Sequence, residues 1–122
     1  MARRTDPTRA TVRAVRQRDD QRCAMCGTGE SRPLTTHHRI NRGMGGSKRA
    51  DLNQPANLLT LCGSGTTGCH GWVTSHPRKA YDLGLAVQRH RDPVEVPVHT
   101  WRGWVFLDNA GQLRPLEEPA FT

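Results

Sequence analysis

The chain has 122 residues, of which 34% are hydrophobic and 5% aromatic, so it is expected to form one domain with a small core. Its formal net charge is +7, with +8 in residues 1–50 and −1 in residues 51–122, and this asymmetry favours a polyanionic partner. No apolar run approaches the roughly 20 residues of a membrane span, and no apolar signal segment follows the basic N-terminus. We therefore expect a cytoplasmic protein without a membrane partner.

The first predicted element is a basic helix. Asp6 is a candidate N-cap, and Pro7 suits the first helical position because its missing N–H costs nothing there. The helix is expected to extend to about Arg18, with Val12 and Val15 on one side. The other side carries three arginines: Arg9, Arg13 and Arg16. Two interpretations of that side stay open, contact with a phosphate backbone and a solvated face.

Four cysteines follow with spacings that indicate a metal site. Cys23 and Cys26 are separated by two residues, as in a zinc knuckle, whereas Cys62 and Cys69 are separated by six. Thiols stay reduced in the cytoplasm, so this pattern favours zinc over two disulfides or a redox dithiol. A small core also gains stability from a metal. We expect all four cysteines to bind one structural zinc ion.

Two strands and two helices are predicted around the second half of this framework. The strands are expected over residues 34–40 and 58–61, and the first of them ends in adjacent histidines. The helices are expected over residues 69–74 and from Pro77, with Gly84 ending the second in the C′ position. Between the strands lies a flexible, glycine-rich basic loop whose backbone N–H groups can approach phosphates.

The C-terminal third indicates β-structure rather than chemistry. Strands are predicted over residues 94–100 and 104–107, followed by a turn at residues 108–111. Trp101 and Trp104 are expected to pack into the small core rather than to stack on bases.

Three histidines supply what the hydrolysis of a phosphodiester needs. A histidine with a pKa near 6.5 can accept a proton from water at neutral pH. A divalent metal can bind the phosphate and the departing 3′ oxygen as a Lewis acid. His37 and His38 on the predicted strand, together with His70 on the predicted helix, fit around one phosphate.

The ordered motifs resemble those of the HNH endonuclease family, whose fold is the ββα-metal, or His-Me, finger. The resemblance covers about residues 18–80. It rests on Cys23-Ala-Met-Cys26-Gly27, His37-His38-Arg39, Gly45-Gly46, Asn57-Leu58-Leu59-Thr60-Leu61-Cys62 and Cys69-His70. Cys69-His70-Gly71-Trp72-Val73 is also similar to the small zinc-bearing HNH proteins of tailed phages, which are often encoded near packaging genes.

The resemblance implies a role for each matched residue. His38 matches the general base, and His37 and His70 match ligands of the catalytic metal. Asn57 matches the central asparagine, which ties the neighbouring loop and so orients the base. The four cysteines match the structural zinc site. The catalytic metal stays open among Mg²⁺, Mn²⁺, Ni²⁺ and Zn²⁺, and His76 stays open between a further ligand and a capping or surface residue.

The expected fold is therefore α+β, with a ββα-metal core stapled by a four-cysteine zinc site. Residues 1–20 are expected to hold the basic helix, residues 21–84 the HNH core, and residues 85–122 a C-terminal β-hairpin extension. The contacts to DNA are expected from four basic residues: Arg39, Arg42, Lys48 and Arg49.

The function implied by the resemblance is a metal-dependent DNA endonuclease that nicks or cleaves phosphodiester bonds. Phage DNA processing or packaging is the implied context, with terminase or other packaging proteins as partners in the host cytoplasm. Two alternatives stay open, a non-catalytic zinc-ribbon module that binds DNA and an accessory subunit of a packaging complex.

Overall fold

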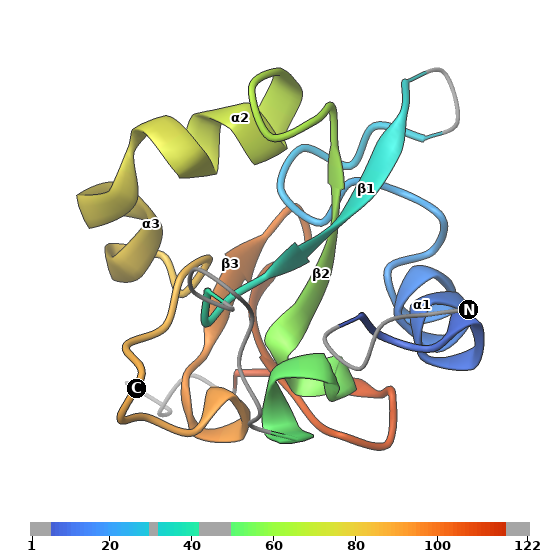
Figure 1. The fold of residues 1–122 in the computed structure, drawn as a ribbon, viewed down its shortest axis with the longest axis vertical. Coiled ribbons are helices and arrows are strands. Elements are labelled where there is room, and N and C mark those ends of the chain that lie inside the picture. The colour runs from blue at the N-terminus through green and yellow to red at the C-terminus, as the bar shows by residue number, and fades with distance from the viewer. Residues whose placement is uncertain (1–5, 30–31, 42–49, 117–122) are drawn as a thin grey trace, which may run out of the picture.

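The computed structural model describes residues 6–29, 32–41 and 50–116. In this part of the chain the elements form an α+β fold with two small antiparallel sheets, three α-helices and short 3₁₀ turns (Figure 1). None of the described helices is long and apolar enough to cross a membrane.

Helix α1 (Arg9–Arg18) begins two residues later than an Asp6 cap would require. Thr8 is the N-cap, since its backbone is extended and its Oγ1 accepts a hydrogen bond from the Thr11 N–H at 3.1 Å. The predicted Asp6 cap was therefore wrong, because the hydroxyl of Thr8 satisfies the first-turn amide instead. The helix packs through Val15, which is fully buried.

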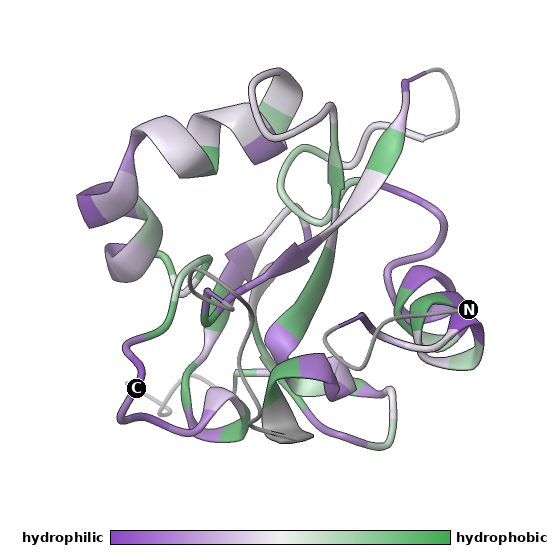
Figure 2. Cartoon of the chain, viewed as in Figure 1, coloured by the Kyte–Doolittle hydropathy of each residue, from purple (hydrophilic) through white to green (hydrophobic). Residues whose placement is uncertain are grey.

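The first sheet pairs β1 (Leu34–His38) with β2 (Leu58–Cys62). Every residue of β2 is buried, and the ribbon of β2 is mostly hydrophobic in Figure 2, whereas the end of β1 that carries the histidines is hydrophilic. In the antiparallel register His38 lies opposite Leu58. Strand β1 stops at His38, short of the predicted end at residue 40, because the chain there turns inward and buries Ile40 in a second small cluster.

Helices α2 (Gly68–Ser75) and α3 (Pro77–Asp82) follow the first sheet, close to the predicted positions. Leu83 is the C-cap of α3, and Gly84 has a positive φ of 71°. This left-handed residue ends the helix as predicted, since glycine adopts that conformation without a steric cost.

The C-terminal part forms a three-stranded sheet in the order β3 (Val98–Thr100), β4 (Gly103–Leu107) and β5 (Leu113–Pro115). The predicted hairpin extension was incomplete, because β5 adds a third strand. Val98, Val105 and Leu107 of this sheet belong to the same core cluster as Leu59 and Leu61 of β2. The C-terminal sheet is therefore one wall of the core rather than an appendage.

Two local predictions in this region were wrong. A 3₁₀ helix occupies Pro93–Glu95 in place of the start of a strand, because the Asp92 side chain caps the Val94 N–H at 3.0 Å. Trp101 and Trp104 were expected in the core, but they are 44% and 38% exposed. Trp104 alternates with the buried Val105 along β4, and alternation places it on the outer face of the sheet.

Candidate functional site

The four cysteines come together from three places: Cys23 and Cys26 from the loop after α1, Cys62 from the end of β2, and Cys69 from the start of α2. Their sulfur atoms all lie within 4.8 Å of one another, and the sulfurs of Cys26 and Cys62 are 3.8 Å apart. Four thiolates bound tetrahedrally at about 2.3 Å from zinc would be separated by about 3.8 Å. All four thiols are free. The donor set and its spacing therefore fit a structural metal such as zinc.

A tight glycine turn explains how cysteines six residues apart reach the same centre. Gly63 and Gly68 have φ values of 87° and 61°, in the left-handed region that favours glycine. A Cβ at Gly63 would overlap the carbonyl oxygen of Thr67, and one at Gly68 would lie 2.6 Å from the carbonyl oxygen of Cys62. The turn brings the Cys69 N–H to 3.4 Å from the Cys62 sulfur. The unusual spacing is thus compatible with a shared metal.

The thiols differ in acidity in the absence of metal. Burial raises the pKa of Cys23 and of Cys69 above the usual value. Burial also raises the pKa of Cys26, but hydrogen bonds with Thr28 and neighbouring thiols outweigh it and lower the pKa to about 6. A metal has to displace protons from the buried thiols, so its binding should strengthen as the pH rises.

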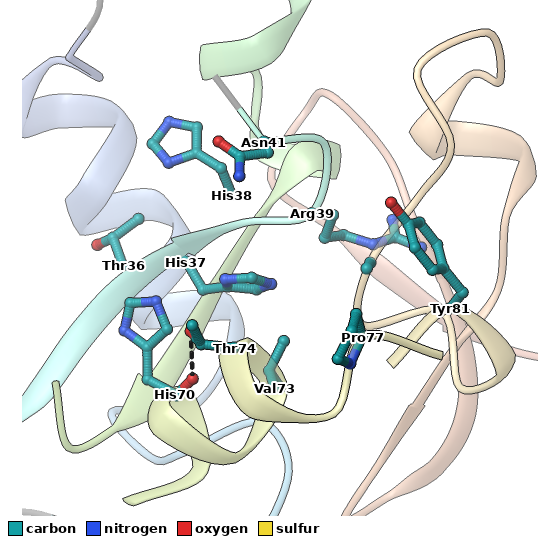
Figure 3. Close-up of a pocket in the computed structure, with 11 residues that line it drawn as sticks. Thr36, His37, His38, Arg39, Asn41, His70, Val73, Thr74, Pro77 and Tyr81 are labelled. Atoms are coloured by element: carbon teal, nitrogen blue, oxygen red, sulfur yellow. Dashed lines mark hydrogen bonds between the residues drawn. The ribbon is translucent and has the colours of Figure 1, made fainter. Parts of the chain in front are cut away.

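The three histidines predicted to act together line one pocket of about 350 Å³ (Figure 3). The end of β1 supplies His37 and His38, and α2 supplies His70. Thr74 at the end of α2, together with Pro77 and Tyr81 of α3, forms the opposite wall. The fold therefore brings together side chains that are more than 30 positions apart in the sequence.

A backbone carbonyl holds the ring of His37. Its Nε2 lies 2.7 Å from the carbonyl oxygen of Leu85, and because a carbonyl only accepts, Nε2 carries the proton and Nδ1 keeps a lone pair. Burial lowers the pKa of His37 to about 4, although the bond to Leu85 opposes the shift. The ring is therefore neutral at pH 7, the form that binds metal ions.

His70 faces His37 across the pocket. The two ring centroids are 5.1 Å apart and the rings are nearly perpendicular, at 70°. The Nδ1 atom of His70 lies 2.7 Å from the hydroxyl of Thr35, so Nε2 is the nitrogen left for a ligand. Burial lowers the pKa of His70. Among the described residues, the only group of three or more potential ligands is the cysteine cluster, so the pocket itself offers a metal two imidazoles.

His38 lies on the other side of the β1 ribbon from His37 (Figure 3), as alternation along a strand requires. Its Nε2 lies 2.9 Å from the Oδ1 of Asn53. When the amide oxygen accepts from Nε2, the basic lone pair is on Nδ1. Asn53 was not singled out from the sequence, and no motif marks it; its contact with His38 depends on the turn before β2.

Asn57 is fully buried and makes the loop-tying contacts expected of it. Its Oδ1 accepts from the Ile40 N–H at 2.7 Å. Its Nδ2 donates to the carbonyl oxygens of Leu52 at 2.9 Å and of Ile40 at 3.3 Å. These bonds use both ends of the amide, so Asn57 fixes the segment after β1 and is too enclosed to contact a metal or a phosphate.

Arg39 was expected to bind DNA, and this prediction was wrong. The residue is 1% exposed, and its guanidinium donates to four backbone carbonyls at 2.6–3.0 Å, those of Gly84, Ala56, Pro93 and Val96. Burial lowers its pKa to about 9, so it stays protonated at pH 7. Arg39 therefore joins the end of β1 to three other segments, at Ala56, at Gly84 and at residues 93–96. The other predicted DNA contacts, Arg42, Lys48 and Arg49, lie outside the described residues.

His76 lies at the surface and does not line the pocket. Its ring stacks on Trp72 with centroids 4.6 Å apart and planes at 13°, and its Nδ1 lies 2.9 Å from the Trp72 carbonyl oxygen. The residue is exposed and is both the C-cap of α2 and the N-cap of α3, although its side chain makes no capping hydrogen bond to α3. Of the two interpretations left open by the sequence, these contacts favour a surface residue.

Comparisons with protein-family models, with curated proteins and with solved structures found no match for this chain. The pocket and the cysteine cluster are therefore interpreted from their own geometry and from the motifs in the sequence.

Proposed function

We propose that the protein is a metal-dependent DNA endonuclease of the HNH type. The observation that carries this proposal is the pocket that all three histidines line and in which His37 and His70 face each other. Two neutral imidazoles can bind a metal ion, and a third imidazole can accept a proton, which are the functions that phosphodiester hydrolysis needs.

In this proposal Nδ1 of His37 and Nε2 of His70 hold a divalent ion, since their other nitrogens are engaged by Leu85 and Thr35. The bound ion would polarise the scissile phosphate and stabilise the leaving 3′ oxygen. His38 accepts the proton of the attacking water through Nδ1. Asn53 holds the opposite nitrogen and keeps the ring in that tautomer.

DNA is the proposed substrate because the half of the chain that carries His37 and His38 has a net charge of +8. The cysteine cluster is proposed to bind structural zinc, which would stabilise a fold with a small core. The similarity of the cysteine–histidine motif to phage HNH proteins extends the proposal to DNA processing beside a terminase in the host cytoplasm.

The test is the nicking of supercoiled plasmid by zinc-loaded protein with added Mg²⁺ or Mn²⁺. We expect the wild type to nick and His38→Ala to be slower by about 10²- to 10⁴-fold, the usual contribution of a general base. His90→Ala is the matched control, since His90 is an exposed histidine that does not line the pocket. If the folded wild type cuts in neither metal but binds DNA as tightly as His38→Ala does, the protein is a binding module instead.

A further inference from the structure

A groove on α1 is lined by arginines at helical spacing. Arg9, Arg13 and Arg16 fall at positions i, i+4 and i+7, which share one helix face. Together with Pro7, Val12 and Gln21 they line a groove of about 540 Å³, and no acidic side chain of the described residues lines this volume. In Figure 1, α1 and α3 lie on opposite sides of the β1–β2 ribbon. The groove is therefore separate from the histidine pocket.

Arg16 is fixed in place and incompletely satisfied. Its Nη2 donates to the carbonyl oxygen of Leu34, the first residue of β1, at 2.9 Å. Its Nε is buried and has no hydrogen-bond partner in the described part of the chain. Buried charged donors are normally paired. Because it is buried, Nε does not reach a ligand in the groove, but a guanidinium that lines the groove and is held in one orientation is suited to phosphate oxygens, whose geometry matches its fork.

In the turn after α1, Gln21 lies at the edge of the groove, whereas the acidic side chains of Asp19 and Asp20 are directed elsewhere. Asp20 and Gln21 have φ values of 61° and 56°, a conformation that is uncommon for residues other than glycine. Gln21 lines the groove. The carboxylate of Asp20 is directed to Arg22 at 3.4 Å, and Asp19 is buried against Arg18. The three groove arginines thus keep their positive charge unopposed by these neighbours.

We propose that this groove binds the phosphate backbone of duplex DNA. Three charges spread over seven helical residues span about 10 Å, which is too long for one small anion and equals about three steps of the 3.4 Å rise between successive phosphates of one strand. The groove lining has no aromatic side chain to insert into a lipid layer. The proposal rests on the proposed function for its substrate, DNA, but it does not require cleavage.

The test measures the salt dependence of binding to a fluorescent 20-base-pair duplex, using zinc-loaded protein without added Mg²⁺ or Mn²⁺. Each phosphate contact contributes about 0.9 to the slope of log K against log salt. We expect Arg13→Gln to reduce the slope by about 0.9 and Arg9→Gln/Arg13→Gln by about 1.8, equally for unrelated duplex sequences. Both residues are exposed, so circular dichroism should be unchanged.

Arg91→Gln is the matched control, because Arg91 is an exposed arginine outside the groove, and its slope should equal that of the wild type. An unchanged slope in the double variant, or an equal drop in Arg91→Gln, would overturn the proposal. Loss of binding to phosphatidylserine vesicles with unchanged duplex binding would overturn it in favour of a membrane surface. This binding measurement uses no added catalytic metal. If the wild type never nicks plasmid, the proposed nuclease activity is wrong, but the salt dependence of duplex binding still tests the groove.

Discussion

Asn57 and Ile40 exchange two hydrogen bonds, one from the Ile40 N–H to Oδ1 at 2.7 Å and one from Nδ2 to the Ile40 carbonyl oxygen at 3.3 Å. Ile40 follows closely after His38 in the sequence. The buried amide therefore sets where the chain goes as it leaves β1, and with it the position of the histidine pair.

Replacing Asn57 by alanine should destabilise the fold by about 2–4 kcal/mol, because each buried polar group left without a partner costs about 1–3 kcal/mol. Urea unfolding followed by circular dichroism measures this change. Asn53→Ala is the informative comparison, since Asn53 is partly exposed and bonds to the His38 ring. We expect it to reduce nicking more than stability. Wild-type stability in Asn57→Ala would show that the loop is held by other contacts.

Arg39→Met should cost 3 kcal/mol or more, because four backbone carbonyls lose the guanidinium that satisfies them. Arg39→Lys should also destabilise, since one ammonium cannot reach carbonyls arranged around a planar fork. Urea unfolding tests both. In the fraction of protein that folds, the slope of log K against log salt for duplex binding should equal that of the wild type. A slope reduced by about 0.9 would show that Arg39 contacts a phosphate after all.

Local patterns were enough to predict the elements that carry the site. The strands β1 and β2 were placed close to their observed bounds, β2 from its apolar run, and the left-handed glycine at position 84 was correctly placed after α3. The cysteine spacing predicted a cluster that the fold assembles. Each of these signals depends on residues near one another in the sequence or on the ligand preference of a single ion.

The errors concern contacts made between distant segments. Arg39 stands in a basic half and beside two histidines, which suggests phosphate, yet two of its carbonyl acceptors are 17 and 57 positions away. Trp101 and Trp104 are large apolar residues, but Trp101 lies in the turn between β3 and β4, and Trp104 lies on the face of β4 opposite the buried Val105. Strand β5 has three residues and forms only because β4 offers an edge.

Gly63→Ala should disrupt the metal centre, whereas Gly65→Ala should not. A Cβ at Gly63 would overlap the Thr67 carbonyl oxygen in a residue with positive φ, while a Cβ at Gly65 meets nothing within 4 Å. Both changes add the same methyl group within the same loop. We expect Gly63→Ala to lose zinc in a competition with a chromogenic chelator at concentrations where Gly65→Ala and the wild type retain it. Equal retention by both variants would mean that the turn does not position Cys62 and Cys69.

The buried, neutral His37 should make the fold sensitive to acid. Its pKa is about 4 in the folded chain and about 6.5 when unfolded. Above pH 6.5 both states are neutral, so this residue adds no pH dependence there. As the pH falls from 6.5 to 4, the unfolded state takes up a proton that the folded state does not. The free energy of unfolding should therefore fall by up to about 3 kcal/mol through this group.

His37→Gln should remove that part of the acid sensitivity, because glutamine keeps an N–H for Leu85 and does not titrate. Urea unfolding at several pH values between 4 and 7 measures it, with His90→Gln as the exposed control. Protonation of the cysteines weakens metal binding in all three chains alike, so the differences between the curves carry the information. The wild type and His90→Gln should lose more stability on acidification than His37→Gln does. Parallel curves for all three proteins would show that His37 takes up its proton as readily in the folded state as in the unfolded one.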